Sequence, residues 1–466
     1  MKIINPTTEE VIKELAISTP SDVKKAVDKA KESFESWSKL DISKRIEIIK
    51  KFQALLKKNK KDFAKLISTE MGKCVIEAEG EIDATLGDID YFISETPKAI
   101  KDEDLDIGLD KVSAKISYEP IGVIGMITPW NFPLDTPIWK IVPGLLTGNT
   151  IIFKPSELST LSGIRIGELL EEAGLPKNVF NVIIGEAKTG KALVESEVNM
   201  ISFTGSSEVG KKVLSGSGQS LKKTVMELGG SDPFIVFKDA IIEQSVNAAL
   251  FGRFLNCGQV CTAAKRIFVQ KEIFDEFVST FVDKVKKLRV GDPLDSNTEI
   301  GPIVSKEQLV NLEKQVKDAI NKGAKSLCGG KRLSRKGYFY EPTVLVNIKE
   351  NMTVFREEVF GPVASLIPFD SIEEAIKLAN DTKYGLGASV WSQDEKVLDK
   401  VAKSIQSGMV WLNDFGTPYQ QCPQGGIKES GLGRELSTYG IREFCNMKTV
   451  VKSRDKTIKQ PWWFPY

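Results

Sequence analysis

A cysteine, a glutamate and an asparagine stand in short polar segments that interrupt apolar stretches of the chain. Cys261 follows Gly-Gln-Val, Glu227 opens Glu-Leu-Gly-Gly, and Asn131 lies within Pro-Trp-Asn-Phe-Pro. Taken singly, such residues are most often a buried thiol, a solvated carboxylate and a turn residue. Taken together, a thiol, a carboxylate and an amide can serve as nucleophile, general base and oxyanion donor. The set therefore indicates covalent catalysis at Cys261.

Histidine is absent from all 466 residues of the sequence. This absence excludes Ser-His and Cys-His catalytic pairs and every imidazole metal ligand. Acid–base chemistry must then use carboxylate, lysine, tyrosine or cysteine side chains. Cys257 and Cys261 are four residues apart, but no second pair completes four ligands, so no metal site is predicted.

A phosphate site is indicated where Thr204-Gly205-Ser206 follows the apolar strand candidate 200–203 and precedes a helical pattern. Backbone N–H groups and a hydroxyl at the start of a helix suit a phosphate group. A second candidate, Gly-Glu-Ala-Lys-Thr-Gly-Lys at 185–191, nearly matches the nucleotide P-loop. It is followed by Ala192 instead of the hydroxyl that holds Mg²⁺, so it is not predicted to bind triphosphate.

The periodicity of apolar residues predicts an α/β protein. The first hundred residues show helical spacing, with Thr19 and Asp41 as expected N-caps. Alternation at 112–118 predicts a half-exposed strand. Further strands alternate with helical segments in two series, which is typical of parallel sheets in two α/β domains. The strands are expected at 121–128, 150–153, 179–184, 200–203, 234–237, 266–269, 364–368, 388–391 and 409–412.

Length and composition limit the possible partners and location. The chain is 41% hydrophobic and 27% charged, which is ordinary for a folded protein, and it is too long for one core. The 64 Lys+Arg and 63 Asp+Glu residues nearly cancel, so nucleic acid is not an expected partner. The first residues lack the apolar core of a signal peptide, and the most apolar stretch is broken by charges and prolines. A cytoplasmic protein without a membrane span is expected.

Seven segments stand in the order and spacing of one known family. They are PWNFP (129–133), KPSE (154–157), FTGS (203–206), ELGG (227–230), GQVC (258–261), EEVFGP (357–362) and GGIKESGLGRE (425–435). Over nearly its whole length the chain resembles the aldehyde dehydrogenase superfamily. The resemblance implies two α/β domains with parallel-type sheets and a small β oligomerisation unit. The implied ranges are 1–103 and 121–229 for an NAD(P)-binding domain, 230–435 for a catalytic domain, and 104–120 with 436–466 for an oligomerisation arm and tail. A homodimer or homotetramer is expected.

The same resemblance implies a role for each matched residue. Cys261 would attack the aldehyde to give a thiohemiacetal and then a thioester, Asn131 and the Cys261 N–H would hold the oxyanion, and Glu227 would activate water. NAD or NADP is the implied cofactor. Glu157 would accept a bond from a free 2′-hydroxyl and repel a 2′-phosphate, whereas Lys154 would do the opposite. The implied cofactor contacts are Thr128, Trp130, Lys154, Glu157, Thr204, Gly205, Ser206, Glu358 and Phe360.

The substrate is less clearly indicated than the reaction. The segments 226–236, 261–266 and 443–451 most resemble the succinate-semialdehyde dehydrogenase branch, which implies succinic semialdehyde. Members of that branch often bind the substrate carboxylate with arginine, but this chain has Trp139 and Leu255 at the two positions. Together with Phe415 these would form an apolar pocket for a medium-chain aliphatic or aromatic aldehyde. Nonphosphorylating oxidation of glyceraldehyde or its 3-phosphate is a further alternative.

Two other readings of the nucleophile remain open. A hydrolase could use Cys261 and Glu227 without a cofactor, although the KPSE and EEVFGP segments would then be unexplained. Cys257 would lie one helical turn from Cys261 if that segment were helical. A reversible disulfide between them could then switch activity off, although a buried thiol that never oxidises is the simpler interpretation.

Overall fold

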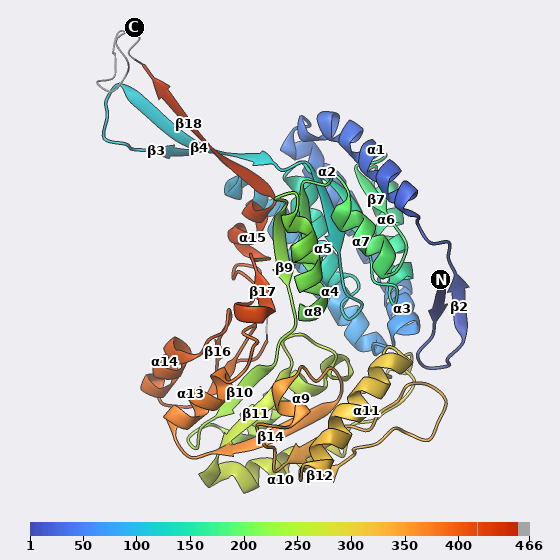
Figure 1. Cartoon of the computed structure of the whole chain (residues 1–466), viewed down its shortest axis with the longest axis vertical. Coiled ribbons are helices and arrows are strands. Elements are labelled where there is room, and N and C mark those ends of the chain that lie inside the picture. The colour runs from blue at the N-terminus through green and yellow to red at the C-terminus, as the bar shows by residue number, and fades with distance from the viewer. Residues whose placement is uncertain (417, 455–466) are drawn as a thin grey trace.

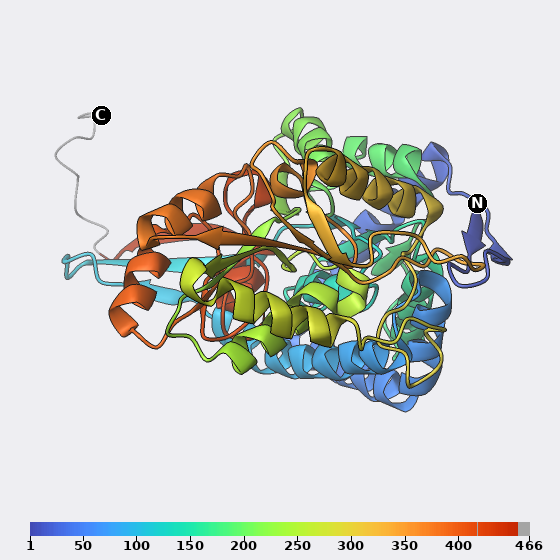
Figure 2. The same cartoon turned by 90° about the horizontal axis from the view of Figure 1, so that it is seen from below.

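Two open β-sheets organise the computed structural model, which describes residues 1–416 and 418–454. Figure 1 shows the first sheet among the blue-to-green helices and the second below it among the yellow and orange ones. Each sheet and its helices form one lobe of the molecule. A slender arm of three strands leaves the first lobe, and the view from below in Figure 2 shows this arm extending away from both lobes. The predicted fold class is thus confirmed by the sheets and by the solved structures described below.

The first sheet is parallel except at one edge. Its order is β17-β9-β8-β5-β6-β7, with only the β17–β9 pair antiparallel. The chain runs outward from β5 to β7, then returns to place β8 beside β5, so the strand order reverses between these two strands. In open α/β sheets, ligands bind beyond the carboxyl ends of the strands at such a reversal. The strands are β5 (Val123–Ile127), β6 (Thr150–Lys154), β7 (Phe180–Val182), β8 (Met200–Thr204), β9 (Lys223–Glu227) and β17 (Gly431–Leu432).

Helices cover both faces of this sheet and begin as the sequence predicts. Thr19 caps α1 through a capping box with Asp22, in which Thr19 N–H donates to the Asp22 carboxylate at 2.9 Å. Asp41 caps α2 by accepting from Ser43 N–H at 2.8 Å. The helices are α1 (Pro20–Ser38), α2 (Ile42–Lys58), α3 (Lys60–Met71), α4 (Val75–Ala99), α5 (Asp135–Leu146), α6 (Thr160–Glu172), α7 (Ala187–Glu195) and α8 (Ser207–Gly218).

The second sheet has the order β12-β13-β14-β11-β10-β15-β16 and is parallel except for the β12–β13 pair. The sequence patterns predicted five of these strands but missed β12 and β13, each only four residues long. The strands are β10 (Asp232–Val236), β11 (Ala264–Gln270), β12 (Lys325–Cys328), β13 (Thr343–Val346), β14 (Val363–Phe369), β15 (Ser389–Trp391) and β16 (Trp411–Leu412). The helices are α9 (Ile242–Phe254), α10 (Phe274–Val285), α11 (Lys306–Asn321), α12 (Thr353–Arg356), α13 (Ile372–Asn380) and α14 (Glu395–Ser404).

The arm consists of β3 (Glu103–Leu105), β4 (Val112–Pro120) and β18 (Cys445–Ser453), and α15 (Ser437–Glu443) leads into it. Antiparallel pairing along all nine residues of β18 and β4 gives the arm its length. An N-terminal hairpin of β1 (Lys2–Ile4) and β2 (Val11–Glu14) was not predicted. The aromatic tail at 461–466 lies outside the described residues. Among the described helices none is long and apolar enough to cross a membrane.

Candidate active site

The predicted catalytic residues lie where the chain crosses from one sheet to the other. Glu227 is the last residue of β9, and Asp232, five positions later, is the first residue of β10. Cys261 lies in the turn just before β11. The carboxyl edge of the first sheet therefore faces the amino edge of the second (Figure 1). Thr128, Lys154 and Thr204 follow or end strands on the same carboxyl edge.

A strained turn delivers Cys261 to this place. After α9 the backbone enters a short 3₁₀ turn, η1 (Leu255–Gly258), in which Asn256 and Cys257 have φ of 51° and 56°. Left-handed backbone at two consecutive non-glycine residues costs energy and persists only where the surroundings hold it. Cys257 is buried in this turn and does not lie one helical turn from Cys261. The condition for the disulfide switch is therefore not met.

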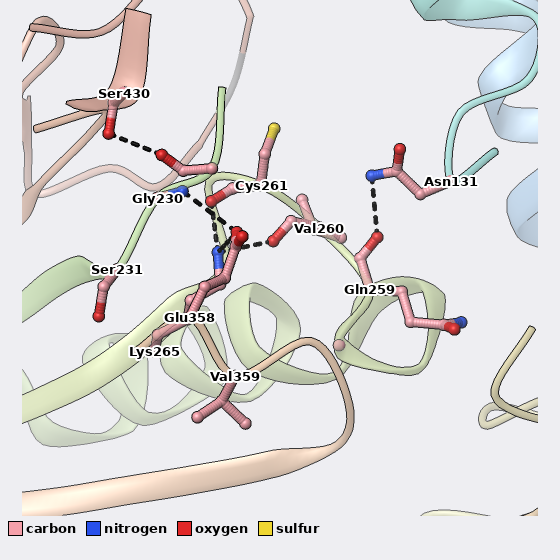
Figure 3. Close-up of polar contacts among 12 residues, drawn as sticks. Asn131, Gly230, Ser231, Gln259, Val260, Cys261, Lys265, Glu358, Val359 and Ser430 are labelled. Atoms are coloured by element: carbon pink, nitrogen blue, oxygen red, sulfur yellow. Dashed lines mark hydrogen bonds and ion pairs between the residues drawn. The ribbon is translucent and has the colours of Figure 1, made fainter. Parts of the chain in front are cut away.

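Asn131 is held against the nucleophile turn. Its side-chain amide donates to Gln259 O at 3.0 Å, and its own carbonyl accepts from the Asn256 side chain at 2.9 Å. The Gln259 side chain in turn accepts from Val304 N–H at 2.9 Å. Figure 3 shows the Asn131 amide directed toward the turn, with the Cys261 sulfur on the side away from Lys265. The structure thus holds the Asn131 amide against Gln259, two positions before Cys261 in the chain.

Glu227 is a buried carboxyl group, 6% exposed, beside a buried ion pair. Burial raises its pKa well above the ordinary value, Glu435 raises it further, and Lys140 and Arg434 oppose the rise. Lys140 and Glu435 form that ion pair, with both side chains fully enclosed. Glu227 Oε1 makes no hydrogen bond to any described residue. A general base needs an acceptor oxygen that is not already bonded to the protein.

Backbone glycine gives Glu227 its space. Gly425 has φ of 149°, and a Cβ placed on it would lie 2.6 Å from Glu227 Oε1. Gly425 is the first residue of the GGIKESGLGRE segment. The backbone of that segment therefore lies directly beside the Glu227 carboxylate. Any larger residue at 425 would displace the Glu227 side chain.

The Cys261 thiol is partly buried, and burial raises its pKa to about 12. Lys265 lowers this pKa, whereas Glu358, Asp232 and Glu227 raise it. The thiol therefore stays protonated at neutral pH and must lose its proton to a nearby base as it attacks. Among the described residues that act on it, Asp232 and Glu227 both have acceptor oxygens without a hydrogen bond, so the loss of this proton does not depend on Glu227 alone.

The Thr204-Gly205-Ser206 segment has the predicted geometry. Thr204 ends β8, and Ser206 caps α8 by accepting from Val209 N–H at 3.3 Å. The Thr204 hydroxyl is buried without a hydrogen-bond partner among the described residues. Gly205 N–H donates to Glu227 O at 3.0 Å, which ties this segment to the catalytic carboxylate's backbone. An orphaned hydroxyl beside a helix start fits a phosphate-bearing cofactor.

The other predicted cofactor contacts fall into two groups. Lys154 is 4% exposed at the end of β6, 3.8 Å from Glu157, whose side chain is about half exposed. Burial lowers the Lys154 pKa, and Glu157 opposes the change. The second group links residues that lie beside the two different sheets. Its Trp130 and Phe360 rings meet edge to face with centroids 5.4 Å apart. Thr128 N–H donates to Lys154 O at 3.3 Å, and Glu358 pairs with Lys265 at 3.1 Å.

Trp139, predicted to line an apolar substrate pocket, has a buried carboxylate as its hydrogen-bond partner. The Trp139 indole N–H donates to the Asp88 carboxylate at 2.7 Å. Asp88 is 3% exposed and lies against Asp135, whose pKa is raised by burial, by the Asp88 charge and by a hydrogen bond with Asp88. A third buried acid, Glu81, accepts from Asp135 N–H at 3.1 Å. Trp139 therefore has buried carboxyl groups as well as apolar groups near it.

Leu255 and Phe415 belong to the second lobe. Leu255 directly follows α9 and begins η1, and Phe415 packs on Phe234 with ring centroids 6.0 Å apart. A cavity of about 630 Å³ lies on the side of α4 that carries Gly87, Asp90 and Tyr91, and it also involves Gln420. Trp139, Leu255 and Phe415 are not among its lining residues. One of its lining residues, Gly87, is the sequence neighbour of Asp88 on α4. Most of the other lining residues are polar.

Sequence reasoning missed the buried charges that frame the site. Lys140, Lys265 and Glu435 are each at most 1% exposed, and none was predicted to act. The sequence did contain a sign of them, namely a charged residue inside an apolar run. Such a residue is rarely buried without a partner. Lys140 interrupts the most apolar stretch of the chain, and Lys265 lies in the core strand β11.

The comparisons with known proteins agree with this geometry. The model of the aldehyde dehydrogenase family matches residues 1–450. The chain is 40% identical over 461 residues to betaine aldehyde dehydrogenase of Bacillus subtilis, covering 97% of this chain and 94% of that protein. It is 38% identical over 452 residues to the mitochondrial succinate-semialdehyde dehydrogenase of rice, Oryza sativa subsp. japonica, covering 97% and 86%.

Solved structures give the same result for fold and cofactor. A point mutant of Staphylococcus aureus betaine aldehyde dehydrogenase in complex with NAD+ superposes with a TM-score of 0.95 at 37% identity, covering 100% of this chain and 96% of that one. An NADP-dependent enzyme from E. coli superposes with a TM-score of 0.95 at 34% identity, covering 97% and 94%. The chain belongs to the aldehyde dehydrogenase family and is an enzyme that uses NAD or NADP.

Proposed function

We propose that Cys261, Asn131 and Glu227 carry out the aldehyde oxidation. The Cys261 sulfur adds to the aldehyde carbon, and the Asn131 amide and Cys261 N–H bind the oxygen as it becomes negative. When bound, the oxidised nicotinamide would accept the hydride from the thiohemiacetal carbon, which leaves a thioester on Cys261. Glu227 then takes a proton from a water molecule, which attacks the thioester and releases the acid. The bond between Asn131 and Gln259 O supports this proposal most directly.

The cofactor contacts are proposed from the same edge of the first sheet. Thr204, Gly205 and Ser206 would bind the pyrophosphate, and Lys154 with Glu157 the adenosine ribose. Glu358 would hold the nicotinamide ribose, with Phe360, Trp130 and Thr128 around it. The orphaned Thr204 hydroxyl supports the first assignment. The reversal of strand order between β5 and β8 supports all of them.

The substrate we propose is an aldehyde without a negative charge at its far end. Asp135 begins α5 four residues after Asn131 and lies against Asp88 of α4, and Trp139 is tied to Asp88. A carboxylate or phosphate beside this pair would be repelled. The nearby buried cation Lys73 is already paired with Glu81, and Lys140 with Glu435. Apolar and cationic aldehydes meet no such penalty.

Succinic semialdehyde is the second candidate. The sequence resemblance to that branch and the rice relative favour it. The same repulsion argues against glyceraldehyde 3-phosphate, whereas free glyceraldehyde carries no charge. A hydrolase without a cofactor is no longer needed to explain Cys261 and Glu227, because the family's members include NAD+ complexes.

The two candidates are separated by rates of reduced nicotinamide formation. Hexanal, 4-aminobutanal and succinic semialdehyde are compared in the wild type and in Asp88→Asn. We expect kcat/KM for succinic semialdehyde to be the lowest of the three, and to rise roughly tenfold in Asp88→Asn because one like charge is removed. Hexanal should change little and serves as the uncharged control. A wild type that prefers succinic semialdehyde would reverse the ranking.

A further inference from the structure

Lys265 is a buried cation directly beneath the nucleophile turn. It is the second residue of β11, and its side chain has no exposed surface. The ammonium group donates to Val260 O at 2.9 Å and to Cys261 O, and pairs with Glu358 Oε1 at 3.1 Å. A lysine ammonium has three donors, so these three acceptors saturate it. Figure 3 shows the group enclosed between the turn and Glu358.

The bond to Val260 O fixes the direction of the Cys261 N–H. Val260 C=O and Cys261 N–H belong to one peptide unit, and in a trans peptide they point in opposite directions. An ammonium group that holds the carbonyl oxygen on one side therefore aims the N–H at the other side. In Figure 3 the Cys261 sulfur also lies on the side away from Lys265. Hydrogen bonding at the carbonyl further polarises the peptide and strengthens the N–H as a donor.

We propose that Lys265 is the positioning residue of the oxyanion site. It orients the Val260–Cys261 peptide so that the Cys261 N–H faces the oxygen of the reacting carbonyl, opposite the Asn131 amide. This inference rests on the proposed function, because it assigns an oxyanion role to that N–H. It adds a residue that does not touch the substrate and acts only through the backbone.

Glu358 links the same lysine to the cofactor side. Its Oε1 accepts from Gly230 N–H at 3.1 Å as well as pairing with Lys265. A side chain on Gly229 would clash with Glu358 Oε2, so the backbone here closes over the carboxylate. The Lys265 ammonium group is thus held on two sides. The nucleophile turn binds it on one side, and Glu358, the residue proposed to hold the nicotinamide ribose, binds it on the other. A mobile lysine could not orient a peptide plane.

The test compares two reactions of Cys261 that need no cofactor. In acylation by p-nitrophenyl acetate, sulfur bonds to the carbonyl carbon, an oxyanion forms, and p-nitrophenolate leaves with the electron pair of the broken C–O bond. In alkylation by iodoacetamide, sulfur bonds to the CH₂ carbon as iodide leaves, and no oxyanion forms. Both rates are followed on the Cys261 peptide by mass spectrometry. Their ratio isolates the oxyanion site from the reactivity of the thiol.

Lys265→Met keeps the apolar stem and removes the donors. We expect the ratio of acylation to alkylation to fall at least about tenfold, less than the hundredfold or more for outright loss of an oxyanion donor. The matched control is Lys383→Met, which breaks the exposed Lys383–Glu357 pair, 2.8 Å long, in the neighbouring segment. Its ratio should equal that of the wild type.

Three results would overturn the proposal: an unchanged ratio in Lys265→Met, an equal fall of both rates, or the same fall in Lys383→Met. If Lys265→Met does not fold, Lys265→Arg retains charge and donors in a different geometry. Its ratio should then fall severalfold, and an unchanged ratio would again contradict the proposal. Failure of the proposed function would look different, because wild-type Cys261 would then not be acylated at all.

Discussion

Burial, more than any single neighbouring charge, determines the protonation of the reacting side chains. It is the largest cause of the raised pKa of both Cys261 and Glu227. A buried carboxyl group with a raised pKa can take a proton from a water molecule at a pH where an ordinary glutamate would be too weak a base. A protein without histidine can therefore carry out acid–base chemistry near neutral pH.

We propose that a single residue, Glu157, decides the choice between NAD and NADP. Glu157 lies 3.8 Å from Lys154, and its half-exposed carboxylate would meet the 2′-position of the adenosine ribose. In Glu157→Ala we expect kcat/KM with NADP to rise relative to NAD by roughly fivefold or more, because a repulsive charge is removed.

The control is Glu168→Ala, an exposed acid on α6 that pairs with Arg165. It should leave the ratio of the two cofactors unchanged. The measurement is the initial rate with each cofactor at fixed aldehyde. A ratio that moves equally in both variants would show that overall charge, not the position of Glu157, decides the preference.

At the scale of elements, buried carboxyl groups join helices to one another. Glu70 of α3 accepts from Leu161 N–H at 2.5 Å and from Ser162 N–H at 2.9 Å, and so caps the start of α6. Burial nevertheless raises its pKa to about 7, more than these hydrogen bonds lower it. The folded state then holds a proton that the unfolded state releases near pH 4.5. The associated stability is full below pH 4.5 and is lost as pH rises to about 7.

Glu70→Gln removes this titration and keeps an oxygen acceptor. Relative to the wild type, its Tm should rise by about 2–5 °C between pH 4.5 and pH 8, since a neutral side chain has no proton to lose. Thermal unfolding is measured at both pH values, with the exposed Glu171→Gln on α6 as the control. A Tm difference that stays constant with pH would contradict the titration of Glu70.

At the scale of the whole molecule, the arm ends in an apolar strand with no partner within the described chain on its outer side. Met447 and Val451 of β18 lie on one face and are 69% and 61% exposed. Two large apolar side chains exposed on the same face of an edge strand indicate an interface. We propose that the chain forms a homodimer or homotetramer through this arm.

The double change Met447→Glu and Val451→Glu adds two negative charges to that face. Lys452→Glu, on the opposite face of β18, changes the charge by the same amount. We expect the double variant to dissociate to a smaller species in size-exclusion chromatography with light scattering, while Lys452→Glu keeps the wild-type mass. A wild-type mass in both variants would exclude this face as the interface.

The sequence allowed the family and most strands of the two sheets to be predicted. It singled out Cys261, Asn131 and Glu227 because each lies in a short motif beside a strand. It did not reveal what surrounds them. The Lys140–Glu435 pair joins residues 295 positions apart, and the Trp139–Asp88 bond joins α5 to α4. Such contacts depend on the packing of distant elements, which no local pattern encodes. The substrate prediction changed for this reason.

The most direct test of the central claim is a single-turnover experiment with Glu227→Gln, an aldehyde and excess NAD. Without its base the enzyme should still oxidise the aldehyde once, giving close to one reduced nicotinamide per active site at 340 nm, and should then stall. Mass spectrometry should find the acyl group as a thioester on Cys261, and Cys261→Ala should give neither signal. Absence of the burst, or an acyl group on any other residue, would contradict the proposed roles of Cys261 and Glu227.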